Sequence, residues 1–82
     1  MTPPPPLAPS AARAAHLPRG AEGVVTAVVG RPGTAERLAA LGIVPGTALR
    51  VIRGGSPMAV AVGDARLGLG RDWAEALVVE PR

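Results

Sequence analysis

The chain has 82 residues, which is enough for one small domain and too short for a deep catalytic cleft. It contains no cysteine, which excludes disulfides, thiolate chemistry and cysteine-based metal sites. Its net charge is +3, and its nine basic residues are scattered arginines, a pattern that favours solubility over a nucleic-acid-binding run. Neither a membrane-span pattern nor a signal-peptide pattern occurs, so we expect a cytoplasmic protein without direct membrane insertion.

The first segment is rich in proline. Residues 3–6 are consecutive prolines, and Pro9 and Pro18 follow. Proline lacks a backbone donor and fixes φ, so this run favours a solvated polyproline II conformation. The sequence predicts a disordered Pro-rich tail over residues 1–17 and a folded domain over residues 18–82. The tail is either a plain extension or a ligand for an aromatic groove.

A strand and a short helix are the first elements expected in the domain. β-branched residues predict a strand over residues 24–29. Residues 34–41 predict a helix, in which Leu38 and Leu41 share one face and are expected to enter the core. Gly42 lies just past the helix, where a left-handed cap is easiest for glycine.

A sharp turn then leads into a half-buried strand. Residues 44–47 carry Pro and Gly at the two central positions of a type II turn. Residues 47–53 alternate in polarity, with Leu49 and Val51 on the expected inner face. The chain is therefore expected to reverse direction directly after the helix.

A hairpin is the clearest element of the second half. Residues 58–62 and 65–69 flank a Gly-Asp pair, which predicts two antiparallel strands joined by a tight II′ turn. Glycine supplies the positive φ that the first central position of this turn needs.

A helical turn and a last strand complete the prediction. Residues 70–75 favour one turn of helix, in which Asp72 and Glu75 have the spacing of a capping box. Residues 77–79 form the last strand. About five short strands around a small aliphatic core indicate a mostly β fold that closes, or nearly closes, into a barrel.

Three segments together resemble the FeoA domain family. Residues 37–47 (RLAALGIVPGT) resemble its signature: an Arg-Leu pair, a Leu-Gly-hydrophobic step, and Pro-Gly leading into a strand. Residues 23–25 fit the opening strand of that domain, and residues 67–69 resemble its closing segment. The resemblance implies an SH3-like barrel of about five strands, with one short helix after the first strand and a helical turn before the last.

The resemblance also implies a function. Free-standing members of this family are cytoplasmic accessory proteins of ferrous-iron uptake, and their expected partner is the cytoplasmic domain of the ferrous-iron transporter FeoB. The same domain occurs at the C-terminus of iron- and manganese-dependent repressors, and the family is commonly associated with transition metals. The alternative is a general SH3-like protein- or RNA-binding module that is not tied to iron transport.

The residue inventory argues against chemistry by this chain. The one histidine, His16, falls in the predicted tail, and residues 30–33 lack the Lys-Ser/Thr ending of a phosphate-binding loop. Turns and helix caps already account for the carboxylates of Asp64, Asp72 and Glu75. We expect no enzymatic activity, no catalytic residue, no cofactor and no metal site.

Protein binding is the function that the residues favour. The predicted partner-binding residues are Trp73, Ile43, Val44, Arg50 and Arg71. Trp is enriched at interface hot spots, although Trp73 could instead plug one end of a barrel that otherwise holds small residues. Of the neighbours Ile43 and Val44, at least one should point outward. No nucleic-acid partner is expected, because a single aromatic residue offers a poor platform for base stacking.

Overall fold

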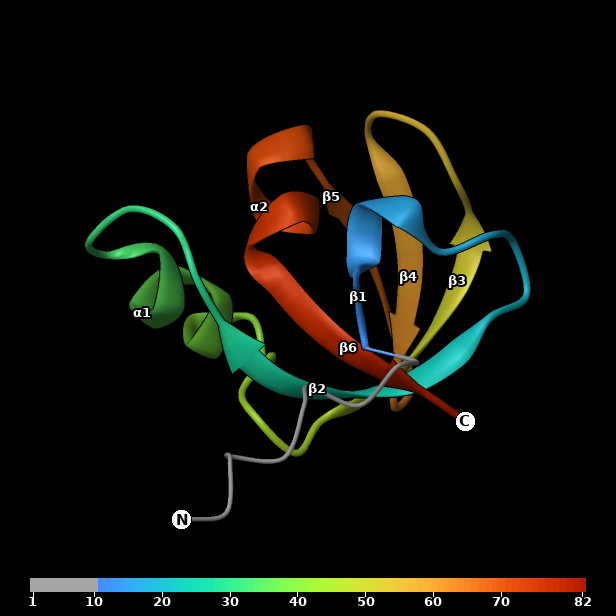
Figure 1. The fold of residues 1–82 in the computed structure, drawn as a ribbon, viewed down its shortest axis with the longest axis horizontal. Helices are drawn as coiled ribbons and strands as arrows, with labels where there is room; N and C mark the ends of the chain where they lie inside the picture. The colour runs from blue at the N-terminus through green and yellow to red at the C-terminus, as the bar shows by residue number, and fades with distance from the viewer. Residues whose placement is uncertain (1–10) are drawn as a thin grey trace, which may run out of the picture.

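The computed structural model describes residues 11–82, which form one curved antiparallel sheet with two short α-helices (Figure 1). The strand order is β1-β6-β2-β3-β4-β5. In chain order the elements are β1 (Ala12–Arg13), the 3-10 helix η1 (Ala14–His16), β2 (Glu22–Val28), α1 (Thr34–Ala40), β3 (Ala48–Arg53), β4 (Met58–Val62), β5 (Ala65–Leu69), α2 (Arg71–Ala76) and β6 (Leu77–Pro81).

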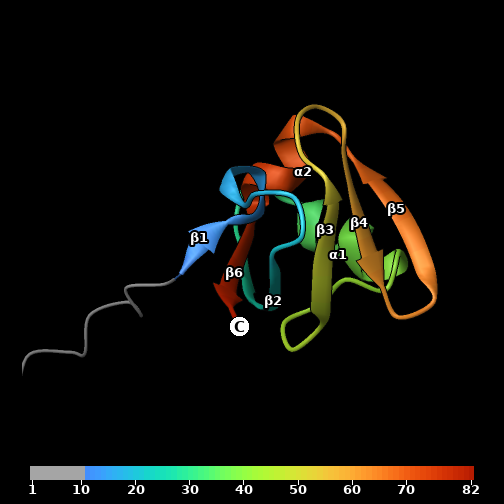
Figure 2. The same ribbon diagram turned by 90° about the vertical axis from the view of Figure 1, so that its right-hand side faces the viewer.

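The sheet curls around its core without closing. Its two edges are β1 and β5, which do not pair with each other, and β5 forms the outer strand on the right of Figure 2. The short helix α2 connects β5 to β6 and packs against both, and it also contacts η1 and β1. The predicted barrel is therefore an open one, with α2 packed between its last two strands.

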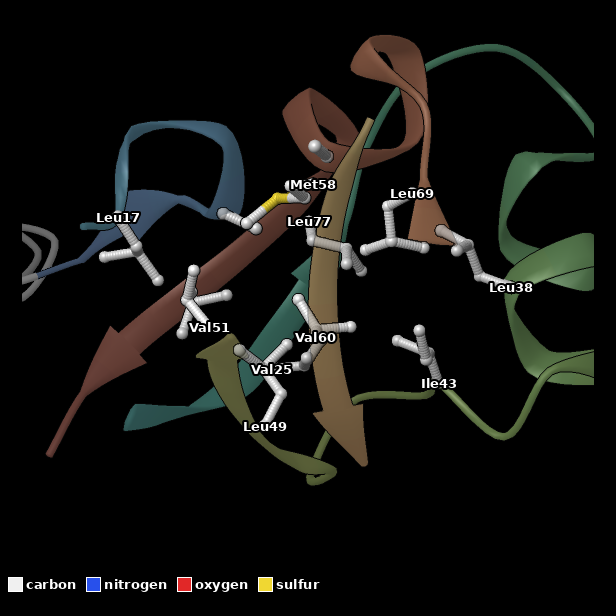
Figure 3. Close-up of a cluster of buried hydrophobic side chains, with 13 residues drawn as sticks. Leu17, Val25, Leu38, Ile43, Leu49, Val51, Met58, Val60, Leu69 and Leu77 are labelled. Atoms are coloured by element: carbon white, nitrogen blue, oxygen red, sulfur yellow. The ribbon is translucent and has the colours of Figure 1, made fainter. Parts of the chain in front are cut away.

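The core is aliphatic, as expected from a chain with a single aromatic residue. Side chains of the sheet and of the α1 region converge on its concave side (Figure 3). Leu49 and Val51 of β3 are 3 % and 1 % exposed, which confirms the predicted inner face of this strand. The largest fully buried side chains are Leu38, Ile43, Met58, Leu69, Leu77, Val25, Val51, Val60 and Val79.

Residues 11–17 belong to the folded domain. β1 pairs with Val78 and Val79 of β6, and Ala14 and Leu17 lie in the core. The prediction of a disordered tail through residue 17 is therefore wrong for residues 11–17. Their partner strand lies more than sixty residues away along the chain, so the local pattern carried no sign of the pairing. The rest of the predicted tail, residues 1–10, lies outside the described residues.

The end of α1 confirms the predicted left-handed cap. Gly42 has φ of 90°, and its N–H donates to the carbonyl oxygen of Ala39 at 2.9 Å. The N–H of Ile43 donates to the carbonyl oxygen of Leu38, also at 2.9 Å. This pair of bonds defines a Schellman motif, in which the residue after the glycine packs on the last turn of the helix. Leu38 and Ile43 are accordingly both buried.

The Schellman motif corrects one prediction. Leu41 was expected in the core beside Leu38, but it is 40 % exposed. The helix stops at Ala40, so Leu41 occupies the cap rather than the next helical position. The space on the inner face is filled by Ile43 after the reversal of the chain.

The turn after α1 is of the predicted type II form and is anchored to β2. Gly46 has φ of 98°, and the N–H of Thr47 donates to the carbonyl oxygen of Val44 at 3.0 Å. The Thr47 hydroxyl also accepts a bond from the Val44 N–H at 3.1 Å. The N–H of Gly46 donates to the carbonyl oxygen of Val25, and the N–H of Val25 donates to that of Thr47.

The β4–β5 hairpin confirms its predicted turn. Val62 pairs with Ala65 across the two-residue loop. Gly63 has φ of 56°, whereas Asp64 does not have positive φ. A positive φ at the first central residue alone is the requirement of a II′ turn.

The predicted capping box is wrong. The N-cap of α2 is Gly70, with no side-chain capping bond, so Asp72 and Glu75 both lie inside the helix. The spacing rule placed the N-cap at Asp72, two residues after the observed N-cap. Asp72 instead occupies the first turn, where a carboxylate interacts favourably with the positive end of the helix dipole.

Candidate functional site

A surface groove of about 730 Å³ lies between the start of α1 and the outer side of α2. We call it the interhelix groove. It combines the β2–α1 loop, two residues of α1, one residue of β1 and four residues of α2. Its lining residues are Arg13, Val29, Gly30, Arg31, Pro32, Gly33, Thr34, Arg37, Asp72, Trp73, Glu75 and Ala76.

Backbone bonds hold the loop wall of the groove in place. The N–H of Val29 donates to the carbonyl oxygen of Ala76 at 2.8 Å, which ties the end of β2 to the end of α2. The N–H of Thr34 donates to the carbonyl oxygen of Arg31 at 3.1 Å. Gly30 and Gly33 have φ of 116° and 90°, backbone conformations that residues other than glycine rarely adopt. These two backbone hydrogen bonds and the two glycines define the path of the loop.

The groove has more cationic than anionic side chains. The exposed arginines Arg13, Arg31 and Arg37 line it, together with the exposed carboxylate residues Asp72 and Glu75. The Nη1 of Arg13 donates to the carbonyl oxygen of Glu75 at 2.8 Å, which fixes this guanidinium against the end of α2. An acidic segment of a partner would meet these arginines, and charge complementarity of this kind favours specific encounter.

Trp73 lies at the boundary between core and surface. It is half-buried and packs against the hydrophobic core, yet it lines the interhelix groove. It also lines a second hollow of about 430 Å³ with Gly68, Gly70, Arg71 and Asp72. The packing of Trp73 against the core is compatible with its role as a plug, and its place in the two hollows is compatible with its role as a contact residue.

The other predicted contact residues are dispersed. Arg71 lies beside Trp73 in the second hollow, whereas Arg50 of β3 lines a separate depression with Glu22 and Arg82. Val44 is 44 % exposed in the turn after α1 but lines none of these three hollows. Ile43 is fully buried, so it cannot contact a partner in the folded protein. The prediction for Ile43 is wrong because the Schellman motif turns it inward.

Sequence reasoning missed most of the groove. From the sequence alone, Arg31 and Arg37 are expected to be scattered solubility charges, and Arg13 is expected in the tail. Their proximity depends on the pairing of β1 with β6 and on the path of the β2–α1 loop. The one available local signal was the cluster of turn residues between β2 and α1, which placed Arg31 just ahead of a helix that carries Arg37.

The described residues show neither a metal cluster nor a membrane-spanning helix. Within residues 11–82, no three His, Cys, Asp or Glu side chains come together in an arrangement that could hold a metal ion. His16 is exposed on η1. In the same range, no helix has the length and apolar content needed to cross a membrane.

Comparisons with known proteins agree on one family. The family model described as "FeoA domain" matches residues 13–81. A crystal structure of an iron uptake regulatory protein (FeoA) superposes with a TM-score of 0.82 at 22 % identity, covering 88 % of this chain and 99 % of that one. Among proteins of curated function, no significant match was found.

Two further solved structures extend the comparison. Stenotrophomonas maltophilia FeoA, complexed with zinc and described as an SH3 domain protein, is 33 % identical, with a TM-score of 0.70 over 80 % of this chain and 86 % of that one. A manganese-dependent transcriptional repressor is 26 % identical, with a TM-score of 0.83 over 100 % of this chain. This chain spans only 45 % of the repressor.

These comparisons confirm the predicted SH3-like fold class, with the difference that the sheet stays open. The family match covers well over half of the sequence and begins at Arg13, within the segment that the fold shows to be structured. This chain belongs to the FeoA domain family.

Proposed function

We propose that this chain is a cytoplasmic accessory protein of ferrous-iron uptake that binds the cytoplasmic domain of the transporter FeoB through the interhelix groove. Membership of the FeoA family supports the link to iron uptake. Related structures carry the same link: one is described as an iron uptake regulatory protein, and the Stenotrophomonas maltophilia protein is proposed as a ferrous iron transport activating factor.

The observation that carries the proposal is the composition of the groove. A half-buried tryptophan lines it together with exposed arginines from β1, the β2–α1 loop and α1. A tryptophan that is anchored on one side by the core offers a large contact area at low entropic cost, and Arg is the other residue type enriched at hot spots. The groove thus suits a partner segment that carries an apolar side chain next to acidic ones.

The proposed mechanism is binding without chemistry. Docking would bias a conformational or assembly equilibrium of the transporter by the difference in affinity for its states. The chain itself would act neither as an enzyme nor as the carrier of the metal.

Calorimetric titration of the chain into the purified cytoplasmic domain of FeoB from the same cell, with and without GTP, tests the proposal. We expect saturable binding that Arg31→Glu and Arg37→Glu each weaken by roughly tenfold, the factor that about 1.4 kcal/mol represents. Arg53→Glu makes the same charge change at an exposed position of β3 that lines none of the three hollows, so it is the matched control and should bind as the unsubstituted chain does.

Three outcomes separate the parts of the proposal. Loss of binding in the groove variants alone supports both the partner and the site. Equal binding by all variants would retain the partner and reject the groove. Absence of binding in either nucleotide state would reject docking on that domain.

A further inference from the structure

The outer edge of β5 carries unpaired backbone groups. Opposing residues of an antiparallel pair alternate between hydrogen-bonded and non-hydrogen-bonded. The two-residue turn makes Val62 and Ala65 a bonded pair, so Val60–Leu67 and Met58–Leu69 are bonded as well. The N–H and C=O groups of Arg66 and Gly68 therefore point away from β4. Among the turn, loop and cap bonds of the described residues, none involves the backbone of Arg66 or Gly68.

Neither backbone conformation nor packing within the described fold requires glycine at position 68. Its φ is not in the left-handed region, and a Cβ placed on it would meet no atom of the fold within 4 Å. Strand interiors normally disfavour glycine, and one reason to place it there is the close approach of another backbone or ligand. Gly68 is exposed and forms one wall of the second hollow, beside Gly70 and Trp73.

From these features we propose that β5 pairs antiparallel with β5 of a second copy, about a twofold axis at Leu67. In this register Arg66 of each copy lies opposite Gly68 of the other, and the two pairs form the bonded rungs. The sheet edge on the right of Figure 2 would become the centre of a continuous twelve-stranded sheet, twice the six strands of one chain.

Each of the two neighbouring registers is disfavoured, one by side-chain charge and the other by a backbone carbonyl oxygen that already accepts a bond. A twofold axis at Arg66 would place two guanidinium groups directly opposite each other, which is destabilising. An axis at Gly68 would require Gly70 to pair, but the carbonyl oxygen of Gly70 already accepts the Ala74 N–H of α2 at 3.0 Å. The axis at Leu67 avoids both problems and leaves each Arg66 facing a residue without a side chain.

Charge and aromatic complementarity give the second copy a contact beyond the backbone. The Arg66 side chain of one copy extends across Gly68 of the other toward the hollow formed by Gly70, Arg71, Asp72 and Trp73. Asp72 offers it an opposite charge beside the like charge of Arg71, and the indole of Trp73 can engage a guanidinium through a cation–π contact. Because the interface is isologous, each of these contacts forms twice.

The first test is sedimentation of the unsubstituted chain at concentrations up to about 1 mM, where a contact with a millimolar Kd is half-formed. We expect the mass to rise from 8.2 kDa toward twice that value. Gly68→Pro removes an outward N–H that β4 does not use and fixes φ in a range that an edge strand accommodates, so it should abolish the rise while the circular dichroism spectrum is retained. A constant monomer at the highest concentration would overturn the proposal and leave Arg66 as a charge that protects the edge.

Disulfide cross-linking tests the proposed register of the two β5 strands. Because the chain has no cysteine, one introduced thiol reports a single position. Leu67→Cys places two thiols on the proposed axis, at the separation of about 4.5 Å between Cα atoms that a non-bonded pair shows, which a disulfide can span. Ala65→Cys is the matched control, whose two copies would lie too far apart to link.

The two cysteine variants give opposite readings. Faster disulfide formation by Leu67→Cys than by Ala65→Cys supports the twofold axis. Equal rates, or faster linking at Ala65, would overturn the register. Arg66→Ala should weaken the sedimentation dimer, whereas Arg53→Ala on β3 should leave it unchanged. These tests use no transporter, so their failure would leave the proposed docking on FeoB untouched.

Discussion

At the scale of single residues, one glycine is required by packing. Gly23 of β2 is buried, and a Cβ placed on it would lie 2.5 Å from the Cγ1 of Val79 and 2.7 Å from the carbonyl oxygen of Glu80. Real Cβ atoms do not approach backbone this closely, so the two strands can pair here only without a side chain. By contrast, Gly54 has open space around its Cβ position and ordinary φ.

Gly23→Ala should therefore separate β2 from β6. We expect the free energy of unfolding to fall by about 1–3 kcal/mol, the usual cost of overpacking. Urea denaturation measures the change. Gly54→Ala is the matched control and should stay within about 0.5 kcal/mol of the unsubstituted chain. Equal stability of the two variants would show that β6 moves aside at no cost.

At the scale of an element, α1 depends on its contacts with the rest of the domain. It has seven residues, and isolated helices of this length are unstable in water. Its stability must come from Leu38, which is fully buried, and from the Schellman motif that brings Ile43 onto the same cluster. Leu41, three residues after Leu38, contributes little because it is exposed.

Leu38→Ala and Leu41→Ala should thus differ sharply. Truncation of the buried leucine should cost about 2–5 kcal/mol through lost burial and the cavity left behind. Truncation of the exposed leucine should cost no more than about 0.5 kcal/mol. Thermal and urea unfolding of both variants checks this, and a comparable loss in the two would place Leu41 in the core as the helical pattern had predicted.

The cap of α1 makes a separate prediction. Gly42 has φ of 90°, a conformation that costs an L-residue about 1–2 kcal/mol. Gly42→Ala should therefore lower the free energy of unfolding by roughly 1 kcal/mol without changing the fold. Ala40→Gly, made at the last residue of the helix, is a useful comparison because it should destabilise by a different route, the backbone entropy of glycine.

At the scale of the whole molecule, the N-terminal segment completes both the core and the interhelix groove. β1 pairs with β6, Leu17 enters the core, and Arg13 bonds to the end of α2. Deleting residues 1–17 should lower the free energy of unfolding by about 2 kcal/mol or more, since burial of one leucine alone contributes roughly 1.5–3 kcal/mol. Deleting residues 1–10 removes none of the described contacts and serves as the control. Unfolding curves that coincide would make β1 dispensable.

The sequence by itself determined the local structure of this protein. The turn after α1, the cap at Gly42 and the II′ hairpin follow from proline and glycine at positions where φ is fixed or must be positive. Alternation in β3 assigned its inner face, and the fixed order of these signals supported the family. All of these depend on neighbours within a few residues, so one chain segment is enough to predict them.

The tertiary structure decided which residues meet. Pairing of β1 with β6 brought residues 11–17 into the fold, and the same pairing placed Arg13 in the groove that Arg31 of the β2–α1 loop and Arg37 of α1 also line. The reversal after α1 exchanged the expected places of Leu41 and Ile43. The β1–β6 pairing joins segments far apart in the chain, which no local pattern of polarity specifies, whereas the exchange of Leu41 and Ile43 follows from the local bonds of the Schellman motif, which the helical spacing of the leucines does not show. The candidate groove joins the β2–α1 region to Arg13 and to α2, and this combination is visible only in the folded molecule.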